Sequence, residues 1–194
     1  MKYYIDITLL PSDDIGHHFL WSKVFQQIHL ALVENKNDDG TSSCGITFPE
    51  FNEKKHQLGR KLRIFAPENK QLEALNLPKW LGRLHDYTHI THIRDVPENF
   101  EKYVRFSRLQ KKSSKERLAR RAVKRHDISY EQAMLDRTDF QPHLSDAPFI
   151  RLKSLGNGNQ FRLLVSIENT DEFIDSVESF NCYGLSNGSV LPWF

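Results

Sequence analysis

The sequence predicts an α+β fold of two domains, a ferredoxin-like (RRM-like) domain at residues 1–98 and a C-terminal α+β domain at residues 99–194. Two observations lead to this prediction. The predicted elements of the first half follow the order β-α-β-β-α-β, which is the ferredoxin-like pattern. The second half combines an arginine-rich helix with two strands around a turn rich in glycine and asparagine, which is typical of a β-hairpin.

The elements of the first domain are bounded mainly by prolines. Residues 2–10 are rich in β-branched and aromatic side chains and end at Pro11, as a strand does. A helix is predicted at 19–34, because apolar residues recur there at helical spacing: Leu20, Val24, Ile28 and Leu32. Three further strands are predicted at 45–48, 61–65 and 88–96. A second helix is predicted at 68–84, with an interruption at Pro78.

In the second domain, an extended basic segment at 103–110 leads into two helices. Ser113-x-x-Glu116 is a capping box, so a basic helix is predicted to begin at about Ser114 and to end near residues 126–127. Ser129-x-x-Gln132 predicts the start of a second, short helix. The remaining predicted elements are strands at 149–155 and 160–167, which flank the turn Gly156-Asn157-Gly158-Asn159.

Positive charge is concentrated in one stretch, although the net charge of the chain is only +2. From Lys102 to Arg125 the chain carries eleven Lys or Arg residues and one acid, Glu116. On a helix, one side of this stretch is apolar, and the other side presents Arg117, Arg120, Arg121, Lys124 and Arg125. Such a cationic stripe predicts a polyanionic partner, most often nucleic acid.

The composition argues against several other classes of protein. No apolar run approaches the ~20 residues of a membrane-spanning helix, and the N-terminus lacks the pattern of a signal peptide. Cys44 and Cys182 are too few for a disulfide framework and are typical of a reducing compartment, so we expect a cytoplasmic protein. His89-x-x-His92 would face opposite sides of a strand, so no metal site and no cofactor are predicted.

His29 is the leading candidate for catalysis among the titratable residues. It lies on the first predicted helix with Trp21 and Phe25, and from position alone a histidine at the edge of the core is the more common outcome. Cleavage of RNA needs only proton transfer and charge stabilisation, because the ribose 2′-hydroxyl is itself the nucleophile. The sequence contains no D-x-D motif that would hold catalytic Mg²⁺.

Other residues are candidates for contact with RNA. Arg108 and Gln110 lie two apart in an extended segment and so leave the same face, where they would read guanine and adenine or would simply be solvated. Phe161 follows the hairpin turn, and it either packs in the core or stacks on a base. Tyr183 precedes Gly184, where the backbone can approach a ligand closely, and is otherwise a strand aromatic.

Characteristic segments occur along nearly the whole chain: KVFQQIHLALV, CGITFPEF, LGRKLRI, SRLQKKSSKERLARRAVKRHDIS, APFIRLKS, FRLLVS and CYGLSNGSVLPWF. Together they resemble the family of CRISPR repeat-RNA processing endoribonucleases of type I-F systems. The most specific segments are SRLQ with the arginine-rich helix after it, and the terminal CYGLS and PWF.

The resemblance implies roles for particular residues. It implies that His29 is catalytic, with Ser154 and Tyr183 beside it in the active site. The implied RNA contacts are the purine-reading Arg108 and Gln110, the base-stacking Phe161, and Arg120, Arg121, Lys124 and Arg125 on the basic helix. Lys124 stands where arginine is usual in the family, which keeps the charge but loses the forked guanidinium. Gly156 stands where a small hydroxyl residue can occur, so a secondary phosphate contact is missing there.

The function implied by the resemblance is metal-independent cleavage of a CRISPR precursor transcript at the 3′ base of each repeat stem-loop. The implied products are a 2′,3′-cyclic phosphate and a 5′-hydroxyl. The implied partners are the repeat RNA, before and after cutting, and the other subunits of the type I-F surveillance complex. Two alternatives remain open at this point: a non-catalytic subunit that binds RNA hairpins, and a DNA-binding regulator.

Overall fold

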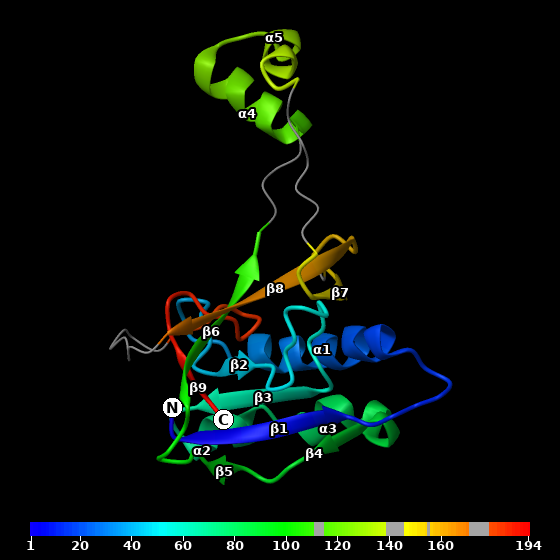
Figure 1. Ribbon diagram of the computed structural model, residues 1–194, viewed down its shortest axis with the longest axis vertical. Helices are drawn as coiled ribbons and strands as arrows, with labels where there is room; N and C mark the ends of the chain where they lie inside the picture. The colour runs from blue at the N-terminus through cyan, green and yellow to red at the C-terminus, as the bar shows by residue number, and fades with distance from the viewer. Residues whose placement is uncertain (111–114, 139–145, 155, 171–178) are drawn as a thin grey trace. The chain divides into compact units, whose positions relative to one another are not determined.

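The computed structural model describes residues 1–110, 115–138, 146–154, 156–170 and 179–194. The chain divides into two compact units (Figure 1). The first unit consists of residues 1–109 and 147–194, and the second consists of residues 110–146.

The described residues of the first unit form two antiparallel sheets, and the first of these consists of strands from the N-terminal half of the chain. Its strands are β1 (Tyr3–Leu9), β2 (Gly45–Thr47), β3 (Lys61–Ala66), β4 (Thr88–Ile90) and β5 (Arg94–Asp95). The strand order is β2-β3-β1-β4, and β5 also pairs with β1. The central strand β1 runs antiparallel to each of its partners. The predicted strands 2–10, 45–48 and 61–65 correspond to β1, β2 and β3.

The main helix of this unit is α1 (His17–Glu34), which corresponds to the helix predicted at 19–34. Its apolar face is fully buried, with Val24, Phe25 and Ile28 at 0% exposure. At about 25 cal/mol per Å² of apolar surface, each such side chain stabilises the fold by roughly 1.5–3 kcal/mol. This packing fixes the position of every side chain that α1 presents elsewhere.

The helix predicted at 68–84 is three shorter elements: α2 (Asn69–Ala74), α3 (Leu77–Leu81) and the 3₁₀ helix η1 (Gly82–Tyr87). The predicted interruption at Pro78 is therefore misplaced, because the break falls at Asn76, which has a left-handed backbone (φ 43°). Pro78 lies in the first turn of α3, where its missing N–H leaves no helical hydrogen bond unmade.

The single strand predicted at 88–96 is also wrong, since β4 and β5 pair with opposite ends of β1. Between them the backbone N–H of Asp6 donates to the Thr91 side-chain oxygen, and Thr91 N donates to Asp6 O, both at 3.0 Å. A side-chain acceptor thus replaces one ladder hydrogen bond, and the strand is interrupted there.

The second sheet consists of β6 (Lys102–Leu109), β7 (Phe149–Lys153), β8 (Gln160–Thr170) and β9 (Leu191–Trp193), in the order β7-β8-β6-β9. The predicted hairpin of β7 and β8 is present, with Ser154 N donating to Asn159 O at 2.8 Å. Strand β9 was not predicted, because it contains Pro192. Proline is tolerated there because β9 lies at the edge of this sheet, beside β6.

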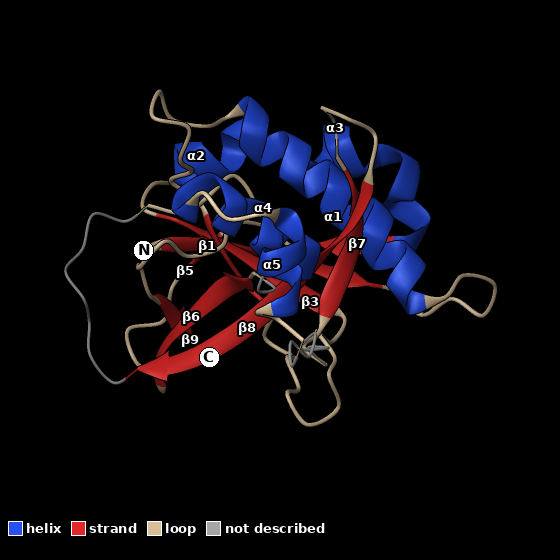
Figure 2. Ribbon diagram, turned by 90° about the horizontal axis from the view of Figure 1, so that it is seen from above, coloured by secondary structure: helices blue, strands red, loops and turns tan. Residues whose placement is uncertain are grey.

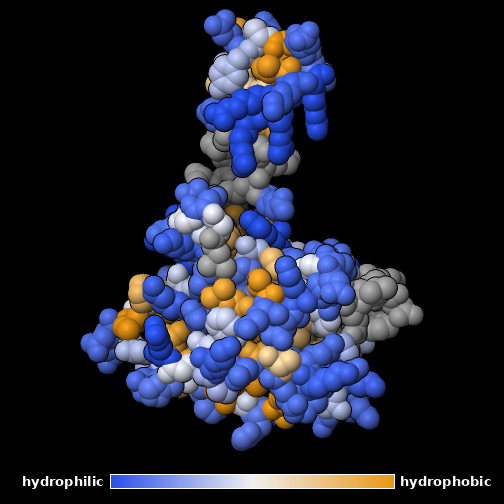
Figure 3. Space-filling view, turned by 180° about the vertical axis from the view of Figure 1, so that it is seen from behind, coloured by the Kyte–Doolittle hydropathy of each residue, from blue (hydrophilic) through white to orange (hydrophobic). Residues whose placement is uncertain are grey.

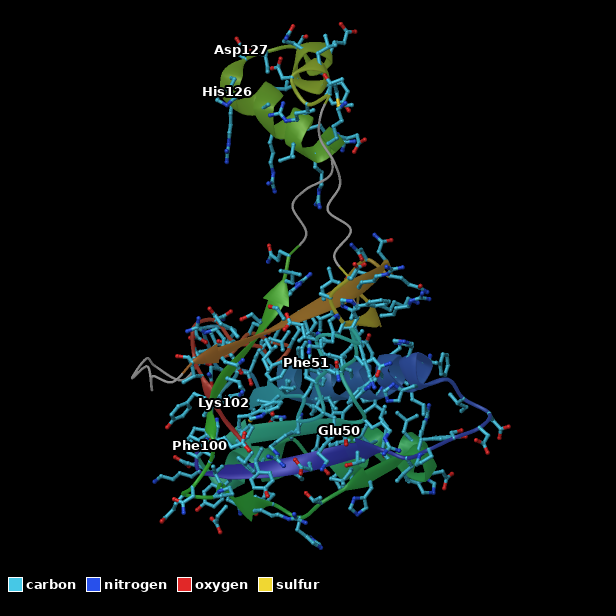
Figure 4. All side chains as sticks on the ribbon, viewed as in Figure 1. Glu50, Phe51, Phe100, Lys102, His126 and Asp127 are labelled. Carbon is cyan, nitrogen blue, oxygen red and sulfur yellow. The ribbon has the colours of Figure 1, made fainter. Side chains whose placement is uncertain are left out.

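In its described residues, the second unit contains two helices, α4 (Lys115–His126) and α5 (Tyr130–Leu135) (Figure 4). Most of the face of this unit seen in Figure 3 is hydrophilic. Their contact is made by small side chains, because Ala119, Ala122 and Ala133 form a buried cluster. The predicted cap of the second helix is confirmed, since the Ser129 hydroxyl accepts from Gln132 N at 3.1 Å. Ser113 and Ser114, at the predicted start of the basic helix, lie outside the described residues.

The α+β class predicted from the sequence is confirmed by these sheets and helices. The predicted domains 1–98 and 99–194 follow the two sheets rather than the two compact units, and as domains they stay a prediction. No helix in the described ranges has the length and apolar character to cross a bilayer.

Candidate active site

His29 lies on α1, and its ring nitrogen is fixed by the backbone of the distant C-terminal segment. Its Nδ1 is 2.8 Å from the carbonyl oxygen of Cys182. A carbonyl oxygen only accepts hydrogen bonds, so Nδ1 carries the proton in this contact. In the neutral imidazole the other nitrogen, Nε2, is then unprotonated and is available as a base.

The carbonyl of Cys182 is held by a tight turn. Asn181 Oδ1 accepts from Tyr183 N at 2.9 Å and from Leu185 N at 3.2 Å, and Gly184 N donates to Asn181 O at 2.8 Å. Gly184 has φ 72°, and a Cβ there would lie 2.7 Å from Ile46 Cγ1. Only glycine fits this position without strain, so the turn packs directly against β2.

The turn also places the phenol ring of Tyr183 against His29. The two rings are stacked, with centroids 4.2 Å apart and planes 13° apart. Tyr183 has two further contacts. Its ring lies edge-on to the Phe161 ring, with centroids 6.4 Å apart, and the Arg108 guanidinium lies 5.5 Å from the Tyr183 ring centroid. Arg108 is also 5.7 Å from the Phe161 ring, so it contacts both aromatic side chains.

A cavity of about 210 Å³ opens beside these residues. It is lined by His29, Ser154, Phe161 and Tyr183, and by Gln26, Leu152 and Lys153. The structure therefore brings together the three residues that the sequence singled out for catalysis and the one singled out for stacking. They come from α1, from the β7–β8 hairpin and from the C-terminal turn.

Two polar residues of the cavity were missed in the sequence analysis. Gln26 Oε1 accepts from Lys153 N at 3.2 Å, and the buried Gln26 Nε2 has no hydrogen-bond partner among the residues that the structure describes. Lys153 is exposed and precedes Ser154, so it adds a positive charge to the rim. The one signal that could have pointed to Gln26 is its position one turn before His29 on the same helix.

The surroundings shift the pKa of the two stacked side chains in opposite directions. Burial lowers the pKa of His29 below its ordinary value of 6.5, and the hydrogen bond to Cys182 O opposes this only in part. Burial raises the pKa of Tyr183, as does the nearby Cys182, while the charge of Arg108 opposes the rise. At neutral pH His29 is therefore an uncharged base and Tyr183 keeps its phenolic proton.

The remaining predicted RNA contacts belong to the second unit. On α4, the side chains of Arg117, Arg120, Arg121, Lys124 and Arg125 are all exposed, whereas Ala119 and Ala122 are buried. The predicted division of this helix into an apolar and a basic side is thus confirmed. Gln110 follows the end of β6 and is exposed.

A comparison with protein-family models matches residues 4–194 to the family described as "CRISPR-associated protein (Cas_Csy4)". The chain belongs to the Cas_Csy4 family. Membership confirms the family that the sequence resemblance indicated. The roles of individual site residues stay predictions.

Two curated relatives agree with this assignment over their full length. The chain is 36% identical to "CRISPR-associated endonuclease Cas6/Csy4" of Pseudomonas aeruginosa (strain UCBPP-PA14), with 100% of both chains covered. It is 31% identical to the protein of the same name from Escherichia coli (strain UTI89 / UPEC), again with 100% of both covered. A solved structure titled "An RAMP protein binding different RNA substrates" covers 99% of both chains with 11% identity and a TM-score of 0.38.

Proposed function

We propose that this Cas_Csy4 protein is a metal-independent endoribonuclease that cuts a CRISPR precursor transcript at the 3′ base of each repeat stem-loop. The observation that carries the proposal is the hydrogen bond from His29 Nδ1 to Cys182 O, which leaves Nε2 unprotonated beside a cavity lined by Ser154 and Tyr183. The names of the two relatives, both CRISPR-associated endonucleases, support the same reading.

In the proposed mechanism, His29 Nε2 takes the proton of the 2′-hydroxyl at the nucleotide before the cut. The 2′ oxygen then bonds to the adjacent phosphorus, and the bond from phosphorus to the 5′ oxygen of the next nucleotide breaks. The proton passes to that 5′ oxygen, so the products are a 2′,3′-cyclic phosphate and a 5′-hydroxyl. Ser154 positions the ribose, and Tyr183 holds the imidazole by stacking on it.

Recognition of the stem is proposed to use three sets of residues. Phe161 stacks against the last base pair, which is consistent with its half-buried place on the cavity rim. Arg108 and Gln110 read purines at the stem base. The exposed basic residues of α4 neutralise phosphates, because side chains rarely read the deep, narrow major groove of A-form RNA along its length.

We also propose that the protein works in the cytoplasm and stays bound to its product as a subunit of the type I-F surveillance complex. The ferredoxin-like assignment of residues 1–98 belongs with this proposal. It is supported by the strand order β2-β3-β1-β4 of the first sheet, with helical segments between β1 and β2 and between β3 and β4.

The test is to incubate the protein with its repeat hairpin in EDTA and to identify the ends of the products. We expect full cutting, a cyclic phosphate on the 5′ fragment, and no cutting of a hairpin with one 2′-deoxy nucleotide before the cut. A non-catalytic hairpin-binding subunit would leave both hairpins intact. Metal-assisted hydrolysis would cut the deoxy hairpin and would stop in EDTA.

The matched protein control is His29→Ala. General acid–base groups contribute about 10²–10⁴-fold in rate, so this variant should lose cutting and should still bind the hairpin. Cutting by His29→Ala at the wild-type rate would remove the basis of the mechanism.

A further inference from the structure

A second cavity, larger than the first, lies between helix α1 and the edge strand β7. These two elements are tied together, because the Ser22 hydroxyl donates to Arg151 O at 2.6 Å and Lys153 N donates to Gln26 Oε1 at 3.2 Å. Figure 2 shows α1 and β7 adjacent in the first unit. The cavity has a volume of about 750 Å³, and we call it the α1–β7 groove. Its lining includes Phe19, Lys23, Phe149, Arg151, Lys153 and Gln160.

The α1–β7 groove adjoins the candidate active site. Leu152 and Lys153 line both the groove and the 210 Å³ cavity that contains His29. Phe19 lies ten residues before His29 on the same helix, which corresponds to about 15 Å along the axis. A chain that leaves the scissile position therefore has a hollowed path along α1.

Aromatic rings and cations alternate along this path. Phe19 is 55% exposed although it is apolar, and Lys23 Nζ lies 5.1 Å from its ring centroid. Phe149 is flanked by the Arg162 guanidinium at 4.6 Å and is stacked with the His18 ring at 6.0 Å and 15°. Phe149 is half-buried, and its ring is already contacted by these two side chains. Phe19 instead leaves an exposed aromatic face beside a cation, which is the kind of surface on which an unpaired base stacks while the cation holds a phosphate.

The charge of the groove is of one sign. Lys23, Arg151 and Lys153 line it, and none of the described residues on its lining is an aspartate or glutamate. Glu50 (Figure 4) lines a separate cavity of about 520 Å³, which shares His17, His18 and Phe149 with the groove, and its carboxylate accepts from Arg60 N at 2.8 Å. The groove thus suits a polyanion that also carries flat, stackable groups.

We propose that the α1–β7 groove binds the single-stranded RNA that follows the cut, on its 3′ side. The proposal rests on the proposed function. With the stem against Phe161 and Arg108 and the scissile phosphate at His29, the strand that continues past the cut leaves on the side of Lys153 and enters the groove. One of its bases stacks on Phe19, and its phosphates contact Lys23 and Arg151.

The experiment compares two uncleavable hairpins, each with a 2′-deoxy nucleotide before the cut. One hairpin ends one nucleotide past the cut, and the other continues for about four, the lower end of the site size of single-strand-binding folds. We expect the longer hairpin to bind roughly tenfold more tightly or better, because one base stacked on an aromatic ring contributes about that much. The same extension on the 5′ side of the stem should give no gain.

The double variant Phe19→Ala, Lys23→Ala should bind the longer hairpin no more tightly than the shorter one. The measure is the ratio of the dissociation constants of the two hairpins. Lys23→Ala alone should lower the salt slope for the longer hairpin by about 0.7, the value for one phosphate contact on a single strand. Lys36→Ala is the matched control, since Lys36 is an exposed lysine beyond the other end of α1.

Three outcomes would overturn the proposal: no gain from the 3′ extension in the wild-type protein, a gain only from the 5′ extension, or an unchanged gain in the double variant. The short hairpin separates these outcomes from failure of the proposed function. If the short hairpin does not bind, or its normal ribose form is not cut, then the proposed function itself is wrong.

Discussion

The imidazole of His29 lies parallel to the phenol ring of Tyr183, at a centroid distance of 4.2 Å and an interplanar angle of 13°. The stack and the hydrogen bond to Cys182 O come from the same turn, so one short segment sets both the plane of the ring and the position of its proton. Preorganisation of this kind avoids reorientation of the base at the moment of reaction.

Replacement of Tyr183 separates the role of its ring from the role of its hydroxyl. Tyr183→Phe keeps the stack, so we expect cutting within a few-fold of the wild-type rate. Tyr183→Ala removes the stack and should slow cutting by about 10²-fold, the typical cost of a misplaced catalytic group. Single-turnover cleavage measures both. Equal losses in the two variants would mean that the hydroxyl contacts the RNA and that stacking is incidental.

The rate of cutting should depend on pH in a definite direction. Burial lowers the pKa of His29 below 6.5, and the proposed base is the unprotonated form. The pH dependence of kcat/KM reports the pKa values of the free enzyme. We therefore expect kcat/KM to rise with pH, to reach half of its maximum below pH 6.5, and to be constant around neutral pH. A half-maximum above 6.5 would contradict the role of His29 as the base in a desolvated site.

Gly184→Ala should damage both stability and cutting. The backbone there is left-handed, and a Cβ would meet Ile46 at 2.7 Å, so a loss of about 1–3 kcal/mol of unfolding free energy is expected, and more if β2 does not yield. Gly82→Ala is the control, because its φ is −55° and its Cβ would meet nothing within 4 Å. Denaturant titration compares the two, and equal stabilities would show that the turn relaxes freely.

The basic side of α4 should determine the salt dependence of RNA binding. Each phosphate contact releases counterions, so replacing both Arg121 and Arg125 by alanine should reduce the slope of log K against log salt by roughly two. The variant with Arg83 and Arg94 replaced removes the same charge from exposed positions of the first unit and should keep the slope. If the two double variants shift the slope equally, α4 has no special part in binding.

Arg108 should contribute to base selectivity beyond its charge. Arg108→Lys retains a cation and loses the fork that grips guanine, which is worth about 1–3 kcal/mol of discrimination. Binding to hairpins that differ at the stem base should show this loss at one position only. Uniform weakening across all hairpins would mean that Arg108 contacts phosphate or serves only to pack against Tyr183 and Phe161.

Local patterns in the sequence were sufficient for the elements that depend on local chemistry. Proline-bounded strands β1, β2 and β3, the apolar spacing of α1 and the Ser129 cap of α5 were all predicted close to their observed bounds. The same holds for the two-sided character of α4, because it follows from the periodicity of the helix alone.

The contacts that assemble the candidate site are long-range, and so no local pattern revealed them. The partner of His29 is a backbone carbonyl 153 residues away, and a carbonyl has no signature in the sequence. The contribution of Gln26 and Lys153 depends on how α1 packs against β7, which is a tertiary contact. Strand β9 was missed because an edge position, rather than residue preference, allows its proline.

Helix α1 also sets the distance between Phe19 and His29. It carries Phe19 near its beginning and His29 ten residues later, with no break between them. One inserted or deleted residue in this interval would turn His29 by 100° about the helix axis and shift it by about 1.5 Å. The number of residues between Phe19 and His29 is therefore as strict a requirement on α1 as the identity of either side chain.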